Sequence, residues 1–492
     1  MNNNLLPESL EVFEPSTQEF IKSIPATSPE EFLVKIKNAK KKKEYWNSSK
    51  PRYRKIILKK FRKAIIKRLE DFIVIITKET GKKKFESLIE LYGAVEHLKN
   101  TETLINSMFR KKRRNVGTLI TKKAWTKLEP VGIAGIISPW NYPLLLTITS
   151  VVEAIAAGNV VILKPSEYTP LTTELLKEVW DKSTGEEDVF QVIYGGSDLG
   201  SKLVNSNHVD IICFTGSTKI GKIIARDCAK YLKPVILELG GKDPMIICDD
   251  TDLNRAVNAA LWGGMTNAGQ TCISVERIYV DERIKDIFIE KISKKVKQLK
   301  AGKSTNCDIG SITTKNGLEK IINQVNKVKN TSGIYQGIVD DKKGYFYPPT
   351  IVVDPNDDSD LMKDETFGPV VSISSFRTIE EVIKKANSVG YGLSASIFTK
   401  NKKRAIIIAK QLKVGSIAIN DVLSHYGIAD LPFGGTGLSG FGRVHGKEGI
   451  KSFCNLKSYM TNRFQIGDEI WWYSKSKRYY NIIIRFLKFY FG

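Results

Sequence analysis

The chain has 492 residues, of which 42% are hydrophobic and 26% are charged, and its formal net charge is +23. This composition is typical of a globular protein and excludes a disordered or fibrous chain, and the length predicts at least two domains. The excess of basic residues would attract phosphates or an anionic membrane surface.

The protein is predicted to be cytoplasmic, and the N-terminal part of the chain is predicted to be helical. Its first residues lack the basic stretch and apolar run of a secretory signal, and residues 28–109 carry apolar side chains at helical spacing among lysines. The six cysteines form neither a CxxC pair nor a cluster with histidine at zinc spacing. We therefore expect no metal site and a reducing, cytosolic compartment.

Short apolar runs follow Trp125 and end in Gly, Pro or Ser. They predict buried strands, separated by helix-like stretches, at residues 131–138, 159–166, 189–196, 209–217 and 234–241. Continuous apolar strands that alternate with helices indicate an α/β fold with a parallel, doubly wound, Rossmann-like sheet. Ligands of such a sheet bind at the carboxyl ends of its strands.

A second α/β domain is predicted after Met245. Its strand candidates are residues 245–250, 276–282, 368–376, 393–399 and 415–420. Residues 113–132 alternate like a hairpin and residues 452–460 like an edge strand, and both lie outside the main sheets. These two pieces are candidates for a small β element that pairs subunits.

Cys272 lies in the segment NAGQTCISVER and is the candidate nucleophile. A thiol attacks as the thiolate, so a catalytic cysteine needs a base or a local field that lowers its pKa. The residues before it, from Gly269 to Thr271, are small or polar and leave backbone N–H groups for an oxyanion. Taken alone, Cys272 fits a structural cysteine at a helix start as well.

Two further residues are candidates for acid–base and oxyanion roles. Glu238 ends an apolar strand and is followed after one residue by two glycines, where partial burial would raise its pKa into the range of a general base. Asn141 lies between two prolines in PWNYP and could donate to a tetrahedral oxyanion. A turn-capping glutamate and a turn asparagine are the competing interpretations.

The segments LKPSEYTP and FTGSTKIGK are candidates for a dinucleotide site. Lys164 can donate to ribose hydroxyls and Glu167 can accept from them while repelling a 2'-phosphate, which favours NAD over NADP. Gly216, Ser217 and Gly221 would bring backbone N–H groups and a helix N-terminus to a pyrophosphate. The same fragment nearly matches a P-loop, but Ile223 replaces the Ser or Thr that would hold magnesium, which argues against an ATPase.

Together these motifs, with ETFGPVVS at 365–372 and LPFGGTGLSGFGR at 431–443, resemble the aldehyde dehydrogenase superfamily in order and spacing over about residues 131–443. The resemblance implies that Cys272 adds to an aldehyde, that Asn141 holds the oxyanion and that Glu238 activates water to hydrolyse a thioester. It also implies nicotinamide contacts for Glu365 and Phe367. The full set of expected coenzyme-binding residues is Trp140, Lys164, Glu167, Gly216, Ser217, Gly221, Glu365 and Phe367.

The expected protein is an NAD-dependent, non-acylating aldehyde dehydrogenase, EC 1.2.1.-, that forms a homodimer or homotetramer. The expected domains are a coenzyme-binding domain at 8–111 and 131–240, a catalytic domain at 241–440, and oligomerisation strands at 112–130 and 451–463. Apolar or small residues around Asn141 and Cys272 favour an uncharged, hydrophobic aldehyde. A non-catalytic scaffold that binds nucleic acid is the alternative, but no nucleic-acid module is present and we expect no specific nucleic-acid partner.

Residues 464–492 extend beyond the family pattern. This tail is too short and too charged to span a bilayer, but its tryptophans and tyrosines stand next to lysines and arginines, as they do at membrane interfaces. It could lie in the headgroup plane, or it could pack on its own or a partner subunit over a substrate entrance. The basic charge favours peripheral membrane contact slightly.

Overall fold

The computed structural model describes residues 8–341, 343–464 and 467–492. Its contacts divide the chain into two units: Met1–Met108 with Pro130–Asn455, and Phe109–Glu129 with Leu456–Gly492. The first seven residues of the N-terminal segment, and residues 465 and 466 of the predicted tail, lie outside the described residues.

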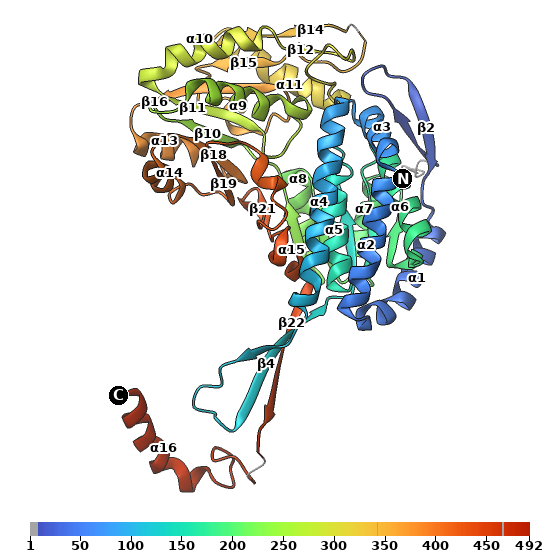
Figure 1. Cartoon of the computed structure of the whole chain (residues 1–492), viewed down its shortest axis with the longest axis vertical. Helices are drawn as coiled ribbons and strands as arrows, with labels where there is room; N and C mark the ends of the chain where they lie inside the picture. The colour runs from blue at the N-terminus through green and yellow to red at the C-terminus, as the bar shows by residue number, and fades with distance from the viewer. Residues whose placement is uncertain (1–7, 342, 465–466) are drawn as a thin grey trace. The chain divides into compact units, whose positions relative to one another are not determined.

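The first unit begins with a hairpin and four helices, which confirms the predicted helical region. Ser28 caps the first helix by accepting from the Glu31 N–H, and Gly81 ends the third at a φ of 76°. Helices α2, α4 and α5 lie side by side (Figure 1). The bounds are β1 (Ser9–Phe13), β2 (Phe20–Pro25), α1 (Pro29–Ser48), α2 (Pro51–Lys67), α3 (Leu69–Thr80) and α4 (Lys84–Met108).

A six-stranded sheet follows, with the order β21-β9-β8-β5-β6-β7, and its strands are parallel except at β21. The chain runs outward from β5 in both directions, so the strand order reverses there and opens a crevice at the carboxyl ends of β5 and β8. The bounds are β5 (Ile133–Ile137), α5 (Leu145–Ala157), β6 (Val160–Lys164), α6 (Pro170–Thr184), β7 (Phe190–Val192), α7 (Ser197–Asn205), β8 (Ile211–Thr215), α8 (Thr218–Ala229), β9 (Val235–Glu238) and β21 (Gly440–Phe441).

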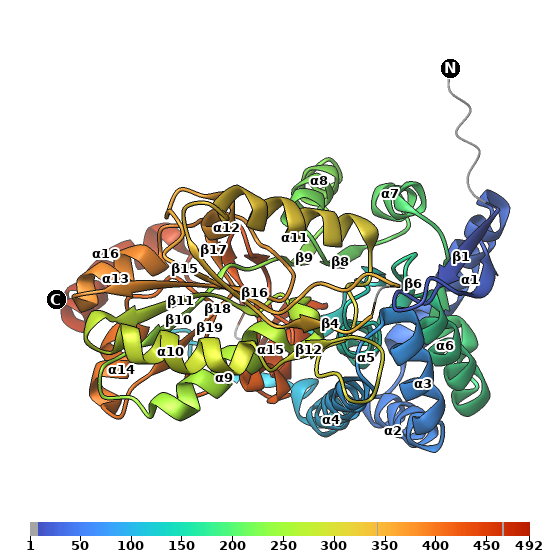
Figure 2. The ribbon, with the colours of Figure 1, turned by 90° about the horizontal axis from the view of Figure 1, so that it is seen from above.

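A second, seven-stranded sheet has the order β13-β15-β16-β11-β10-β18-β19, with only β13 antiparallel to its neighbour. Figure 2 shows α9 and α10 on one face of this sheet and α11 and α12 on the other. The strand bounds are β10 (Asp243–Ile247), β11 (Val275–Asp281), β13 (Gly333–Gln336), β15 (Thr350–Val353), β16 (Val370–Phe376), β18 (Ser394–Phe398) and β19 (Ser416–Ile419).

The helices of this part pack their apolar sides on the sheet, and two short strand pairs lie outside it. The helix bounds are α9 (Leu253–Met265), α10 (Lys285–Val296), α11 (Lys315–Val328), α12 (Asp360–Lys363), α13 (Ile379–Ala386), α14 (Lys402–Ala409) and α15 (Gly446–Ser452). The short pairs are β12 (Lys300–Ala301) with β14 (Ile338–Val339) and β17 (Tyr391–Gly392) with β20 (Thr436–Gly437). Two parallel sheets flanked by helices confirm the predicted α/β fold.

The second unit contains a three-stranded sheet of the order β22-β4-β3 and the helix α16. Its elements are β3 (Lys112–Arg114), β4 (Lys122–Pro130), β22 (Cys454–Asn462) and α16 (Ser476–Phe491). The last residue of β4 and the first two residues of β22 belong to the first unit. The predicted hairpin is confirmed as β3 and β4 and the predicted edge strand as β22, and the structure places the two next to each other in one sheet, which was not predicted. Among the described residues no helix combines the length and apolar character needed to cross a membrane.

Candidate active site

A cavity of about 260 Å³ in the first unit brings residues of both large sheets together. It lies at the carboxyl ends of β5, β8 and β9, where a doubly wound sheet binds its ligand. The polar residues on its walls include Asn141, Ser217, Glu238, Gln270, Cys272 and Glu365, and the apolar residues include Leu146, Ile312, Phe433 and Val444. The candidate nucleophile, oxyanion donor and base therefore share one cavity.

Cys272 stands at the end of a tightly wound loop before β11. Asn267 and Ala268 adopt left-handed φ values of 53° and 54°, and Gly269 follows at 71°. Burial, together with the negative charge of Glu365 and then of other carboxylates, holds the pKa of the Cys272 thiol above its ordinary value. Burial and the nearby carboxylates thus favour the neutral thiol over the thiolate, and a base that removes the thiol proton would counter this shift.

Asn141 is buried in the loop after β5, and its side chain is aimed at the cysteine loop. Its Nδ2 donates to the main-chain oxygen of Gln270 at 2.8 Å. An amide nitrogen carries two hydrogens, so this bond leaves one for an oxyanion. Trp140, the residue before it, meets Phe367 edge to face at 5.4 Å, and both rings line the cavity.

Glu238 is the last residue of β9 and is 5% exposed. Among the described residues neither of its carboxylate oxygens has a hydrogen-bond partner. Burial raises its pKa well above the ordinary value, although the charge of Arg443 opposes the shift. A raised pKa makes the carboxylate a stronger base toward a proton of water, which is what general-base catalysis requires.

Of the predicted coenzyme-binding residues, some line the cavity and others lie outside it. Gly216 and Ser217 line the cavity, and Ser217 caps α8 through its hydroxyl, so the N-terminus of that helix faces the cavity end. Gly221 lies within α8, where a β-carbon would approach Leu239 to 2.5 Å, and it is not a cavity residue. The absence of a side chain at Gly221 therefore allows α8 to pack closely against Leu239.

Lys164 is the last residue of β6 and Glu167 follows that strand, at the same edge of the sheet but outside the cavity walls. The Lys164 Nζ lies 3.3 Å from a Glu167 carboxylate oxygen. Burial lowers the pKa of Lys164, while the glutamate charge raises it. Glu167 is half exposed, so its carboxylate is available to a ligand.

The loop that carries Glu365 and Phe367 is held by a buried carboxylate that the sequence analysis missed. Glu276, on β11, accepts from the N–H groups of Thr366 and Phe367 and pairs with Lys242 of the ELGGK segment. Burial raises the pKa of Glu365 to about 7. The adjacent charges of Glu276 and Arg277 inside a strand with apolar neighbours are a signal that could have identified Glu276 in the sequence.

Other cavity residues were also missed. Tyr426 and Phe433 come from the last third of the chain, Thr149 and Ser150 come from α5, and Lys320 comes from α11. Lys320 is a cation on the cavity wall, whereas the flanks of Asn141 and Cys272 contain none. Within the described residues no group of three or more His, Cys, Asp or Glu side chains is placed to hold a metal ion.

The chain matches the model of the aldehyde dehydrogenase family over residues 3–459. It is 33% identical to a 4,4'-diapolycopene aldehyde oxidase of Methylomonas sp. over 88% of this chain and 82% of that protein. It is 31% identical to a probable NADP(+) succinate-semialdehyde dehydrogenase of Sinorhizobium fredii over 91% of both chains. Among solved structures, betaine aldehyde dehydrogenase of Staphylococcus aureus in complex with NAD+ superposes with a TM-score of 0.89 at 30% identity, covering 95% of this chain and 94% of that one.

Proposed function

Because the chain belongs to the aldehyde dehydrogenase family and is an oxidoreductase, we propose that it oxidises a hydrophobic aldehyde to the carboxylic acid with NAD as coenzyme. One observation carries the proposal: a single cavity is lined by the thiol of Cys272, the amide of Asn141 and the carboxylate of Glu238, together with the N-terminal end of α8. Thiol, oxyanion donor and base are the three groups that thioester chemistry requires.

In this proposal the sulfur of Cys272 adds to the aldehyde carbon, and the thiol proton leaves to a base. The resulting thiohemiacetal oxyanion accepts hydrogen bonds from the Asn141 Nδ2 and from the Cys272 backbone N–H. The coenzyme, when bound, supplies the hydride acceptor that turns this adduct into a thioester. Glu238 then takes a proton from water, whose oxygen attacks the thioester, and the carboxylic acid and the free thiol are released.

The residues present suit a nicotinamide dinucleotide. Gly216 and Ser217 offer a helix N-terminus to a pyrophosphate. Glu365 and Phe367 line the cavity beside Cys272, where a nicotinamide ribose and ring would lie. At the other end, the half-exposed carboxylate of Glu167 beside Lys164 suits ribose hydroxyls and repels a 2'-phosphate, which supports NAD over NADP.

The cavity wall supports an uncharged substrate. Leu146, Ile312, Phe433 and Val444 line the same cavity as Cys272 with apolar side chains. Lys320 also lines this cavity, and its positive charge opposes the burial that raises the pKa of Glu365. A carboxylate-bearing aldehyde would compete with Glu365 for that lysine, so an apolar aldehyde is favoured.

The second unit is assigned to surface contacts. We assign coenzyme binding to residues 8–111 and 131–240, the nucleophile to 241–440 and subunit pairing to 112–130 and 451–463. Helix α16 has no buried residue, no acidic residue and four basic ones, Lys477, Arg478, Arg485 and Lys488. At 100° per residue these four fall on one face and the Ile, Leu and aromatic side chains on the other, which suits a helix lying at a membrane surface.

An activity panel tests the proposal. Aldehydes of increasing chain length are incubated with NAD or with NADP, and the reduced coenzyme is followed by its absorbance. We expect NADH formation that improves with apolar chain length and is lost in Cys272→Ala. Turnover that is unchanged in Cys272→Ala would overturn the assignment of the nucleophile.

A further inference from the structure

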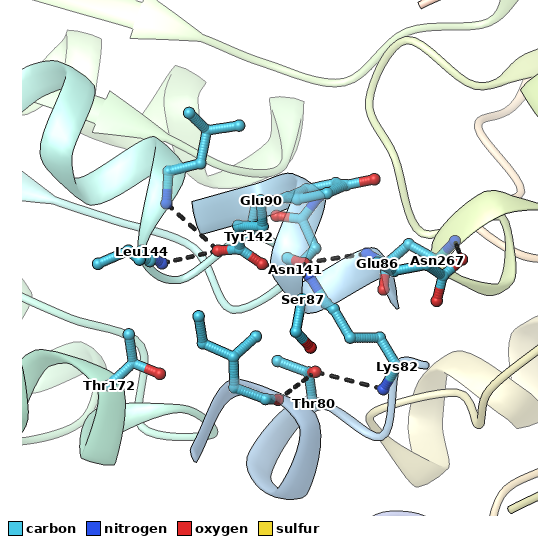
Figure 3. Close-up of polar contacts among 12 residues, drawn as sticks. Thr80, Lys82, Glu86, Ser87, Glu90, Asn141, Tyr142, Leu144, Thr172 and Asn267 are labelled. Carbon is cyan, nitrogen blue, oxygen red and sulfur yellow. Dashed lines mark hydrogen bonds and ion pairs between the residues drawn. The ribbon is translucent and has the colours of Figure 1, made fainter. Parts of the chain in front are cut away.

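The main-chain carbonyl of Asn141 accepts hydrogen bonds from two side chains. It accepts a hydrogen bond from the Lys82 Nζ at 2.8 Å and another from the Asn267 Nδ2 at 2.9 Å. The Asn141 side chain is fixed separately, by its bond to the Gln270 carbonyl. Both ends of the proposed oxyanion donor are therefore held, and Figure 3 shows Lys82 and Asn267 beside it.

Lys82 belongs to the turn between α3 and α4 and is fully buried. Its ammonium forms an ion pair with Glu90 at 2.6 Å and lies 4.1 Å from the centroid of the Tyr142 ring. The other Glu90 oxygen accepts from the N–H groups of Leu144 and Leu145 at the N-terminus of α5. The pair thus fixes the loop at residues 141–144 at both of its ends.

The same part of α4 also holds the cysteine loop. Glu86 accepts from the Asn267 backbone N–H at 2.7 Å and from the Thr266 hydroxyl at 3.2 Å. The Tyr142 hydroxyl is 2.8 Å from the Thr271 hydroxyl, next to Cys272. Through Glu86 and Lys82, one short segment of the N-terminal helices contacts the loop of the donor and the loop of the nucleophile.

We propose that Lys82, paired with Glu90, is a positioning residue that sets the Asn141 amide in its oxyanion-binding orientation relative to Cys272. This inference rests on the proposed function of that site. Burying two charges is expensive, and replacing a buried pair by apolar residues is often neutral or stabilising, so fold stability alone does not require it. We infer that the pair orients Asn141, because the Lys82 ammonium donates a hydrogen bond to the main-chain carbonyl of that residue.

The test uses acetyl transfer from p-nitrophenyl acetate to Cys272, followed by the release of p-nitrophenolate. In this step the C–S bond forms and the ester C–O bond breaks through a tetrahedral oxyanion, and no coenzyme is needed. Alkylation of Cys272 by iodoacetamide, which displaces iodide and forms no oxyanion, is the matched control. Failure of the proposed aldehyde oxidation would leave this readout intact, so the two failures are distinguishable.

The principal variant is Lys82→Met/Glu90→Gln, which removes both charges and keeps a carbonyl to cap α5. We expect acetyl transfer to slow by about 10-fold or more, against about 10²- to 10³-fold for Asn141→Ala, while alkylation stays near the wild-type rate. In an Asn141→Ala background the same change should cost less than about 3-fold, because residues that act through one another are not additive.

A second variant removes the other hydrogen bond to the Asn141 carbonyl without changing the charge of the protein. Asn267→Gly keeps the left-handed backbone and removes the second donor to the Asn141 carbonyl, and we expect slower acetyl transfer with normal alkylation. Three results would overturn the proposal: acetyl transfer at the wild-type rate in Lys82→Met/Glu90→Gln, an equal loss in that variant with and without the Asn141 side chain, or equal slowing of acetylation and alkylation.

Discussion

The α-carbon of Gly241 packs against the main-chain oxygen of Cys272, so closely that a β-carbon at residue 241 would lie 2.5 Å from that oxygen. The neighbouring Gly240 makes a similar approach to the Glu365 carboxylate, which accepts from the Gly241 N–H. The two glycines of ELGGK therefore let the end of the β9 segment meet both the nucleophile loop and the proposed nicotinamide loop.

Gly241→Ala should displace the loop of Cys272. The oxygen it would strike belongs to the backbone, so relief requires the loop to move, and we expect a loss of about 1–3 kcal/mol of stability with a larger loss of activity. Gly196→Ala is the matched control, since its β-carbon would meet no atom within 4 Å. Thermal unfolding and turnover measured together check this; a Gly241→Ala enzyme with wild-type turnover would contradict the packing argument.

Stability should depend on pH through Glu79. This buried carboxylate caps α6 by accepting from the Leu171 and Thr172 N–H groups, and burial raises its pKa to about 8 from 4.5. A raised carboxyl pKa means that the folded state binds the proton more tightly, so its contribution is present below 4.5 and is lost as pH rises through 8.

We therefore expect the melting temperature of Glu79→Gln to fall less between pH 6 and pH 9 than that of the wild type. The difference corresponds to the stability that the wild type loses when Glu79 releases its proton. Glu174→Gln, on the exposed side of α6, is the surface control. If the melting temperatures of the wild type and of Glu79→Gln changed equally with pH across this range, Glu79 would not be the group whose titration affects stability.

Coenzyme choice should depend on Glu167. Its carboxylate stands beside Lys164 and would repel a 2'-phosphate. In Glu167→Ser we expect the ratio of kcat/KM for NAD to that for NADP to fall by about 10-fold, since like-charge contacts cost up to several kcal/mol. The exposed Glu187→Ser is the control, and an unchanged ratio in Glu167→Ser would place the 2'-position elsewhere.

The tail should bind anionic vesicles. We expect the full chain to float with vesicles that contain anionic lipid, and less so in high salt, whereas a chain ending at residue 463 should not. Substituting Gln for the four basic residues of α16 should weaken flotation. The matched control substitutes Gln for four exposed lysines of α2, namely Lys59, Lys60, Lys63 and Lys67. Equal flotation of the shortened chain would leave subunit packing as the role of the tail.

Most strands of the two large sheets were predictable because they are largely apolar runs, and β5, β6 and β8 begin and end within a few residues of the expected positions. Strands β13, β15 and β21 were not predicted. The hairpin of β1 and β2 was not predicted, since its buried residues alternate with exposed ones over only a few positions. Helix α7 was missed for a similar reason, as it is short and follows two glycines.

The candidate site was predictable where its residues lie at strand ends or in unusual local segments, as Asn141, Glu238 and Cys272 do. The buried charges that hold it were not. Lys82 contacts a carbonyl 59 residues away, and Glu276 bonds to N–H groups 90 residues away. Sequence spacing shows which residue types are present, but only the fold shows which loops meet.

In the proposed reaction Cys272 carries the acyl group and Glu238 activates the water that hydrolyses it. Its most direct test is the mass of Glu238→Gln after mixing with NAD and an apolar aldehyde. We expect one equivalent of NADH in a burst, slow turnover, and an adduct on Cys272 that weighs the aldehyde less two hydrogens. Steady turnover near the wild-type rate with no adduct on Cys272 would contradict it.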